Sequence, residues 1–448
     1  PLFRWTVTEG LKRLELEMEP QRLTAEPTDA LKHIKAMDRP GCYLLLDFHP
    51  YLDNPLHVRL IKEIAQRHEE LPKTLIFLSH SLKIPSELRH LCARFDLELP
   101  DRPAIRELIR EEAELWQSRA RRKVRADPAA VEQLSGNLTG VTRTDARGLI
   151  RSAIENDGAI LQEDLPEVMK AKYELIGQDG AISFEYDTAK FSDIAGLKRL
   201  KNWLDQRRTA FSGKAGNMDP PKGIMLLGVQ GGGKSLAAKA VAGRFGVPLL
   251  RLDFGALYNK FYGETEKNLR HAIKIAETMA PCVLWMDEIE KGIAHSNSDD
   301  GLSQRVLGSL LTWMAERKAP VFVVATSNDI ERLPPELVRK GRLDEIFFVD
   351  LPDTDSRQGI FDIHLRQRNL APSGFNLQLL GEASEGFTGA EIEQAIVSSL
   401  YAAQAQGSAL QQQHLLAEIA RTRPLSIVMA EKIERLRNWA AARTVPAH

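Results

Sequence analysis

A short glycine-rich segment, GVQGGGKS at residues 228–235, constrains most strongly what this 448-residue chain can fold into. It follows the apolar run KGIMLL and precedes the helical pattern LAAKAVAGRFG. Glycines let the backbone curl so that successive N–H groups face one anion, and the following helix points its positive end at that anion. The spacing G-x-x-x-x-G-K-[ST] therefore predicts a phosphate-binding loop between a strand and a helix.

Individual residues of this loop have expected roles. Lys234 is expected to reach the β- and γ-phosphates of a bound triphosphate, and Ser235 to ligate Mg²⁺. The other nucleotide-binding residues of the segment are expected to be Gly228, Val229, Gln230, Gly231, Gly232, Gly233 and Leu236.

The groups that hydrolysis would need follow along the chain. Asp287 and Glu288 end the apolar run LWMDE, where the first would hold the metal ion and the second would polarise the attacking water. Asn328 ends VFVVATSN and could fix the water or the γ-phosphate, although an Asn before Asp329 is also typical of a simple turn. We expect these strand ends to meet at one edge of a sheet.

Two arginines in LVRKGRLDE, Arg339 and Arg342, leave two interpretations open. They are either surface charges or arginine fingers, which stabilise the charge that develops on a transferring phosphoryl group. A finger accelerates hydrolysis by roughly 10³- to 10⁵-fold.

The wider pattern predicts an α/β fold. From about residue 220 onward, apolar runs of strand type alternate with helical periodicity, which indicates a doubly wound parallel sheet, and the chain becomes helical after Pro352. The first part repeats features of the second: residues 75–90 resemble residues 321–340, and residues 139–154 resemble residues 385–400. This shared order favours a degenerate internal duplication, in which the first copy lacks the glycine loop and has no ATP site.

The ordered set GVQGGGKS, LWMDE, VATSN and LVRKGRLDE, with FSDIAGLKRLKNWL before it and GFTGAEIEQAI after it, resembles an AAA+ ATPase module of the classical AAA clade. The full-length pattern is similar to the conserved chloroplast-open-reading-frame AAA+ family of algae, cyanobacteria and other bacteria. Val229, Gln230 and Gly232 depart from the family's usual Pro-Pro and Thr, which makes the loop more flexible.

The resemblance implies further roles. Asp193, Ile194, Ala195 and Gly196 are expected beside the adenine. Gly389 and Ala390 are expected where a helical lid approaches the nucleotide, and the arginines would reach a neighbouring subunit. The resemblance also implies a homo-oligomer, usually a hexamer, with ATP and Mg²⁺ as cofactors. Phe261, Tyr262 and Gly263 match an aromatic pore loop that grips a polypeptide client.

The expected domains follow from these patterns. They are a degenerate AAA-like α/β domain at 1–117, a helical lid-like segment at 118–175, a linker at 176–192, the large ATPase domain at 193–355, and a helical lid with C-terminal helices at 356–448.

Composition narrows the possible functions. A net charge of −1 argues against a nucleic-acid-acting ATPase, although the basic run SRARRKVR at 118–125 keeps that alternative open. The three cysteines, Cys42, Cys92 and Cys282, are too scattered for a disulfide framework, and HEEL at 68–71 lacks the second histidine of a metalloprotease motif. We expect a protein of the cytoplasm or plastid stroma without a membrane span, which remodels proteins or serves as a slow nucleotide-gated scaffold.

Overall fold

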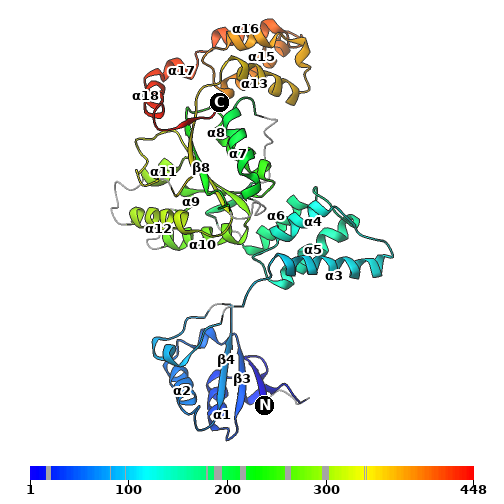
Figure 1. Cartoon of the computed structure of the whole chain (residues 1–448), viewed down its shortest axis with the longest axis vertical. Coiled ribbons are helices and arrows are strands. Elements are labelled where there is room, and N and C mark those ends of the chain that lie inside the picture. The colour runs from blue at the N-terminus through cyan, green and yellow to red at the C-terminus, as the bar shows by residue number, and fades with distance from the viewer. Residues whose placement is uncertain are drawn as a thin grey trace. The chain divides into compact units, whose positions relative to one another are not determined.

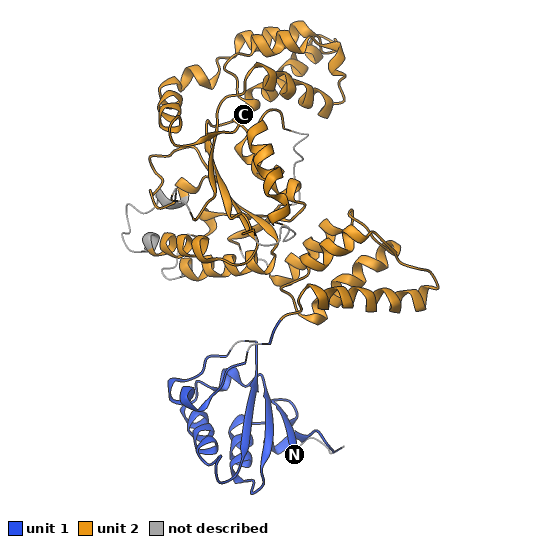
Figure 2. Cartoon of the chain, in the orientation of Figure 1, with its two compact units in different colours: residues 1–98 blue, residues 99–448 orange. Residues whose placement is uncertain are grey.

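The structure is a computed structural model. It describes residues 1–16, 22–80, 82–95, 97–177, 180–185, 194–211, 218–257, 264–294, 302–337, 339 and 341–448. The chain divides into two compact units, Pro1–Glu98 and Leu99–His448, which Figure 2 shows in different colours.

The N-terminal unit is a four-stranded sheet covered by helices (Figure 1). The strand order is β2-β1-β3-β4, in which β1, β3 and β4 are parallel and β2 is antiparallel to β1. Its elements are β1 (Leu2–Thr6), β2 (Gly10–Arg13), η1 (Arg22–Thr24), α1 (Pro27–Ala36), β3 (Gly41–Leu46), η2 (His49–Tyr51), α2 (Pro55–Gln66), β4 (Lys73–Leu78) and η3 (Ser86–Leu91). Aromatic side chains, Trp5, Tyr43 and Phe48, fill its core.

The second unit begins with a helical part. It contains α3 (Arg102–Ala120), β5 (Arg125–Ala126), α4 (Pro128–Asn137), α5 (Arg143–Asp157), β6 (Ala159–Ile160) and α6 (Leu165–Ile176). The side chains of Ile105, Leu108 and Ile109 on α3 pack into its core. The expected boundary between residues 117 and 118 therefore falls inside α3, whose buried face belongs to the helical part, and the structure places the division at residues 98 and 99.

A buried lysine joins this helical part to the rest of the unit, which contains the expected ATPase domain and is called the ATPase part below. The Nζ of Lys172 on α6 donates hydrogen bonds of 2.7 Å to the carbonyl oxygens of Asn137, Thr139 and Thr278. Burial lowers the pKa of Lys172 to about 7. The first two acceptors lie in the helical part and Thr278 ends α10, so the side chain ties the two together.

The ATPase part is built on a seven-stranded sheet in the order β13-β12-β8-β11-β10-β9-β7. All neighbouring pairs are parallel except β7 with β9. The strands are β7 (Ile182–Glu185), β8 (Gly223–Gly228), β9 (Leu249–Leu252), β10 (Cys282–Met286), β11 (Val321–Ser327), β12 (Glu345–Val349) and β13 (Val445–Pro446). Every residue of β8, β10 and β11 is buried, as expected for central parallel strands covered on both faces.

Helices cover both faces of this sheet (Figure 1), as the alternating pattern predicts. One face carries α7 (Lys198–Phe211) and α8 (Lys234–Phe245). The other carries α9 (Phe254–Leu257), α10 (Glu264–Thr278), α11 (Ile289–Ala294) and α12 (Leu302–Glu316). The prediction of a doubly wound parallel sheet is confirmed.

The region after β12 is helical, also as predicted. It contains α13 (Thr354–Gln367), η6 (Pro372–Gly374), α14 (Leu377–Ala383), α15 (Gly389–Ala405), α16 (Gln412–Arg421), α17 (Leu425–Val428) and α18 (Ala430–Ala440). Thr388 and Glu391 form a reciprocal capping box at the start of α15. The chain then returns to the sheet, where β13 pairs with β12.

Two strands were not expected where they occur. β7 lies within the expected linker at 176–192 and pairs with β9, and β13 lies within the region expected to be only helical. Both are short, and each is held by pairing with one strand of the sheet, β7 with β9 and β13 with β12.

The two sheets share an arrangement. In the N-terminal unit, the neighbouring strands β4, β3 and β1 are parallel, and the next strand in the sheet, β2, is antiparallel. In the ATPase part, the neighbouring strands β11, β10 and β9 are parallel, and the next strand, β7, is antiparallel. The antiparallel strand comes after β1 in one case and before β9 in the other. The three parallel strands thus occur in the same chain order and the same spatial order, which supports the duplication hypothesis.

Candidate functional site

The glycine loop lies between β8 and α8, as the spacing predicts. Gly231 and Gly233 have φ values of 76° and 92°, in the left-handed region that glycine adopts without strain. Gly233 immediately precedes Lys234, the first residue of α8, so the loop leads directly into the N-terminus of a helix. The loop therefore has the backbone of an anion-binding site.

Lys234 is folded back into this loop. Its side chain is buried, and Nζ donates to the carbonyl oxygens of Gly228 at 3.0 Å and Val229 at 2.7 Å. Burial lowers the pKa of Lys234 to about 8, while the nearby carboxylates of Glu290, Asp287 and Glu288 raise it. The ammonium is therefore protonated in most molecules at pH 7 and presents a positive charge at the loop.

The acidic pair directly follows β10. Thr326, on neighbouring β11, donates from Oγ1 to the Asp287 carboxylate at 2.6 Å and accepts from the backbone N–H of Glu288 at 3.0 Å. Arg251 forms an ion pair with the other oxygen of Asp287 at 3.3 Å. The pairing of β10 with β11 thus fixes both acids at the carboxyl edge of the sheet.

Glu288 lies between two nitrogen donors. Its Oε1 accepts from Nδ2 of Asn328 at 3.1 Å, and its Oε2 pairs with Nζ of Lys291 at 2.5 Å. Glu288 also has a φ of 48°, rare for a side-chain-bearing residue, which ends the strand sharply. The structure thus brings together Asp287, Glu288 and Asn328.

A further carboxylate was missed by the sequence reasoning. Glu290 is buried, and its Oε1 accepts from the backbone N–H of Asn328 at 3.0 Å. Among the described residues, neither Oε2 of Glu290 nor Oδ1 of Asn328 has a hydrogen-bond partner, although both atoms are buried. Unpaired buried oxygens beside the phosphate loop fit a site that binds a polar ligand or water.

A cavity of about 610 Å³ opens in front of the loop, within the size range of nucleotide-sized ligands. Its wall contains most of the expected nucleotide-binding residues: Ile194, Ala195, Gln230, Gly231, Gly232, Gly233, Lys234, Ser235, Leu236, Asp287, Glu288, Asn328, Gly389 and Ala390. Gly228 and Val229 instead border a smaller neighbouring pocket with α17 and α18. Gly196 is not among the wall residues, and Asp193 lies outside the described residues.

Two histidines in the cavity wall were also missed. His364 comes from α13, where burial lowers its pKa. His448 follows β13, and its Nδ1 accepts from the backbone N–H of Leu197 at 3.4 Å. Within the described part of the chain, the buried Nε2 of His448 has no partner. No motif marks either residue, because each reaches the site only through the folding of the C-terminal region.

The two candidate arginine fingers, Arg339 and Arg342, do not line this cavity. Arg342 donates from its guanidinium to the carbonyl oxygen of Glu336, and Arg339 is exposed. Neither is among the described residues that line the cavity. The structure thus does not bring them to the nucleotide site of their own chain.

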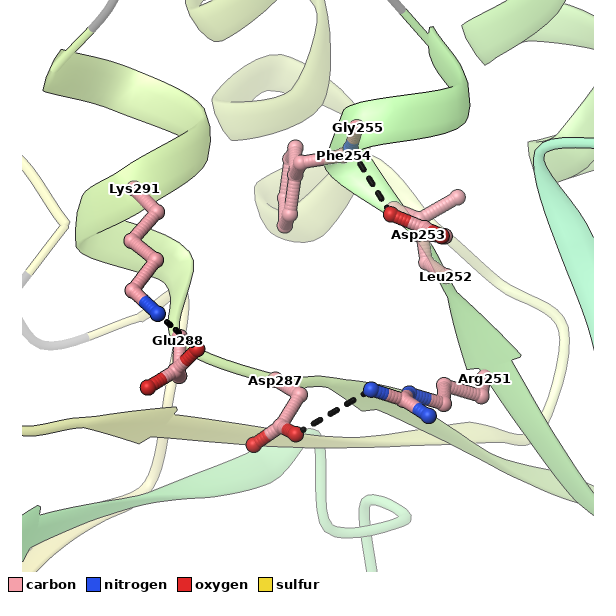
Figure 3. Close-up of a pocket in the computed structure, with 8 residues that line it drawn as sticks. All are labelled: Arg251, Leu252, Asp253, Phe254, Gly255, Asp287, Glu288 and Lys291. Carbon is pink, nitrogen blue, oxygen red and sulfur yellow. Dashed lines mark hydrogen bonds and ion pairs between the residues drawn. The ribbon is translucent and has the colours of Figure 1, made fainter. Parts of the chain in front are cut away.

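A second cavity, of about 270 Å³, lies beside the acidic pair (Figure 3). The side chains of Arg251 and Lys291 point toward the two acids from opposite sides, from β9 and α11. Asp253, Phe254 and Gly255 form another part of its wall. Phe261, Tyr262 and Gly263, the expected pore loop, lie outside the described residues.

The residues present fit Mg²⁺. The ion prefers oxygen ligands from one or two protein groups together with phosphate oxygens and water. The Ser235 hydroxyl is exposed in the cavity wall, and the Asp287 carboxylate lies at the end of β10 in the same wall. These two groups are the oxygen donors expected from the sequence. None of the described helices is long and apolar enough to cross a membrane.

Family comparisons agree with this geometry. Residues 224–351 match the model of the ATPase family associated with various cellular activities (AAA). Residues 1–97 and 103–179 match the N-terminal and second domains of SpoVK-like AAA ATPases, which agrees with the division at residues 98 and 99.

Individual relatives extend the match to nearly the whole chain. The AAA domain-containing protein ycf46 of Guillardia theta is 37% identical over 93% of this chain and 82% of its own length. Its counterpart from Pyropia yezoensis is 36% identical over 92% and 84%. A cell division cycle protein 48 homolog of Archaeoglobus fulgidus is 36% identical over 47% of this chain and 30% of its own length. The chain belongs to the AAA ATPase family, and within it to the ycf46 group of AAA domain-containing proteins.

Proposed function

We propose that this protein hydrolyses Mg²⁺-bound ATP in a homo-oligomeric ring and uses the energy to remodel a polypeptide client. The observation that carries the ATPase proposal is the convergence of Lys234, Asp287, Glu288 and Asn328 on one cavity at the carboxyl edge of the sheet. A loop alone would support only nucleotide binding, whereas the acidic pair behind it supplies the groups that hydrolysis needs.

Binding begins at the loop. The backbone N–H groups of residues 231–235 and the N-terminus of α8 receive the phosphates, and Lys234 exchanges its two carbonyl acceptors for phosphate oxygens. Ser235 and Asp287 would hold Mg²⁺, which would supply positive charge against the phosphates. Ile194, Ala195, Gly389 and Ala390 enclose the base and sugar from the remaining sides of the cavity.

Glu288 is the proposed general base of hydrolysis. Its carboxylate polarises the water that attacks the γ-phosphate, and the amide of Asn328 holds the carboxylate in place at 3.1 Å. The ion pair with Lys291 opposes this role, because Nζ of Lys291 occupies Oε2, one of the two oxygens that could receive the proton of the attacking water. Release of Glu288 from Lys291 is therefore a step of the proposed cycle.

A neighbouring subunit completes the site. Arg339 is exposed and does not line its own cavity, so its guanidinium is available to the γ-phosphate of an adjacent copy. A relative named proteasome-activating nucleotidase, from Aeropyrum pernix, is 36% identical over 43% of this chain. Its name joins a nucleotidase to the proteasome, which supports the polypeptide client.

The sequence supports the mode of client engagement. By their resemblance to AAA+ modules, Phe261, Tyr262 and Gly263 are proposed as the pore loop of the ring, whose aromatic side chains would grip an extended polypeptide. An unfolded protein such as casein should therefore stimulate hydrolysis, and Phe261→Ala should abolish that stimulation. Stimulation that persists in Phe261→Ala would exclude threading past this loop.

A slow nucleotide-gated regulator is the second candidate. The short ion pair between Glu288 and Lys291 favours it, because a ring in which that pair persists would bind ATP and rarely cleave it. Lys291→Ala separates the two candidates, since it accelerates hydrolysis in a gated regulator and leaves a motor largely unchanged.

The test of the whole proposal combines assembly with turnover. Mass photometry with and without Mg²⁺-ATP measures the ring, and phosphate release measures hydrolysis. Wild-type protein should assemble and release phosphate, whereas Lys234→Ala should bind no ATP. ATP binding retained by Lys234→Ala, or a wild-type ring that releases no phosphate with any protein client, would contradict the proposal.

A further inference from the structure

The N-terminal unit, which has no phosphate loop, carries a cluster of possible metal ligands. Asp47, His49 and His80 each offer one ligand atom, and these three atoms all lie within 4.8 Å of one another. None of the three residues belongs to the nucleotide site of the second unit.

Strand register brings the cluster together. Asp47 directly follows β3, His49 begins η2, and His80 lies two residues beyond the end of β4. β3 and β4 are parallel neighbours whose last residues, Leu46 and Leu78, lie opposite each other. The backbone N–H of Asp47 donates to the carbonyl oxygen of Leu78 at 2.9 Å, which joins the two strand ends at the cluster.

The local backbone suits this arrangement. Asp47 has a φ of 51°, in the left-handed region that Asp tolerates better than most residues. This conformation ends β3 abruptly and turns the chain into η2, which starts at His49. A sharp turn at this point places two potential ligands, two residues apart, beside the third from the neighbouring strand.

The side chains leave a binding position open. The rings of His49 and His80 meet edge to face, with centroids 4.6 Å apart and planes at 85°. Asp47 and His80 are exposed and His49 is half-buried. Among the described residues, the buried Nδ1 of His49 has no hydrogen-bond partner. A buried polar nitrogen without a partner is costly, and a metal ion, or a water molecule on that ion, would satisfy it.

The position in the fold is also that of a functional edge. In the ATPase part, the corresponding strands β10 and β11 are directly followed by Asp287 and Asn328. In the N-terminal unit, β3 and β4 are followed by Asp47 and His80 at the same carboxyl edge. The runs CYLLLDF and CVLWMDE show the same placement of Cys and Asp along β3 and β10. The first copy thus keeps an acid where the second copy binds its metal, and adds two imidazoles.

We propose that Asp47, His49 and His80 form a binding site for a divalent transition metal ion. Two imidazoles and one carboxylate favour ions such as Zn²⁺, Co²⁺ or Fe²⁺ over Mg²⁺ and Ca²⁺, which prefer oxygen ligands alone. Ligands placed tetrahedrally at about 2.1 Å from an ion lie roughly 3.4 Å apart. The exposed side chains of Asp47 and His80 reach that spacing by rotation, and the remaining position stays open to water or to a ligand.

Co²⁺ provides the test, because its visible absorption reports ligand type and geometry. The full-length chain, free of any affinity tag and of nucleotide, is titrated with Co²⁺ in excess Mg²⁺, which occupies the carboxylate sites. We expect one saturable Co²⁺ per chain, displaced by Zn²⁺. His49→Ala and His80→Ala should each weaken Co²⁺ binding at least about tenfold.

Matched variants keep the result interpretable. Asp47→Asn preserves size and the left-handed backbone preference, so it should lose Co²⁺ affinity while thermal unfolding stays unchanged. His33→Ala removes an exposed histidine from α1, and Asp287→Asn alters the ATPase site; both should bind Co²⁺ as the wild type does. Absence of saturable Co²⁺ binding, or an unchanged spectrum in folded His80→Ala, would show that the two rings only pack against each other.

Discussion

Asn328 donates a hydrogen bond from its side-chain amide to the carboxylate of Glu288, with Nδ2 3.1 Å from Oε1. The two residues are 40 positions apart, and the parallel pairing of β10 with β11 brings them together. The same Asn328 accepts no hydrogen bond at its buried Oδ1 within the described part of the chain. The amide nitrogen thus orients the proposed base, and Oδ1 is left to accept a hydrogen bond from a water molecule.

Asn328→Ala should slow hydrolysis without weakening ATP binding. Loss of the amide lets the Glu288 carboxylate turn toward Lys291, and positioned general bases contribute roughly 10²- to 10⁴-fold to rate. Phosphate release should therefore fall at least tenfold, while the Kd for a non-hydrolysable analogue stays within about twofold. A large loss of affinity with a normal rate at saturation would instead assign Asn328 to nucleotide binding.

His448→Ala should weaken nucleotide binding and reduce the preference for adenine. His448 lines the cavity and its buried Nε2 has no partner in the described structure, and a single hydrogen bond contributes about 0.5–1.5 kcal/mol. The Kd for ATP should thus rise about two- to tenfold, whereas the Kd for GTP should change less. Calorimetric titration with both nucleotides measures this. Equal changes for ATP and GTP would show that His448 only supports Leu197.

Lys172→Met should loosen the helical part from the ATPase part and change how stability depends on pH. The wild-type pKa of about 7 lies below the ordinary lysine pKa of 10.5, so between these values the unfolded chain binds more protons than the folded one. Burial of the charged Lys172 destabilises the folded chain fully below about pH 7. This destabilisation disappears as the pH rises toward 10.5, because the unfolded chain then also loses the proton.

The comparison with this variant isolates the effect of Lys172. Methionine leaves the carbonyls of Asn137, Thr139 and Thr278 without their donor, which should cost about 1–3 kcal/mol for each that remains unpaired. The wild type should gain Tm relative to Lys172→Met between pH 7 and pH 9. A difference in Tm that does not change with pH would contradict the link between burial and protonation.

Arg339→Ala should abolish hydrolysis in a ring while leaving ATP binding intact, because the guanidinium serves the neighbouring site. Mixing Arg339→Ala with Lys234→Ala subunits should restore part of the activity, since some sites then combine an intact loop with an intact finger. Arg332→Ala, an exposed arginine paired with Asp329, is the matched control and should hydrolyse ATP normally. Mixed rings without any recovery would place the action of Arg339 within its own subunit.

Much of the site was predictable because its residues lie at strand ends in recognisable spacing. Lys234 and Ser235 follow a glycine loop, and Asp287 and Asn328 each end an apolar run, so a parallel sheet must bring them to one edge. Glu290 was missed because nothing in the sequence separates it from an ordinary surface acid two residues after Glu288. Its importance depends on burial, which only the packing of α11 reveals.

Other features depend on long-range pairing. His448 reaches the nucleotide cavity because β13 pairs with β12, and two residues of extended chain carry no periodic signal. The helical pattern of α3 runs through residues 117 and 118, where the expected boundary lies, whereas the two compact units divide at residues 98 and 99. The strand β7 has four residues and pairs only at the sheet edge, which hid it in an expected linker.

The most direct test of the central claim is phosphate release from Mg²⁺-ATP by wild-type and Glu288→Gln proteins, measured together with ATP affinity. Glutamine keeps the hydrogen bond from Asn328 possible but cannot accept a proton from water. We predict that Glu288→Gln binds ATP as tightly as the wild type and releases no phosphate above background. Phosphate release by Glu288→Gln at the wild-type rate would contradict the account.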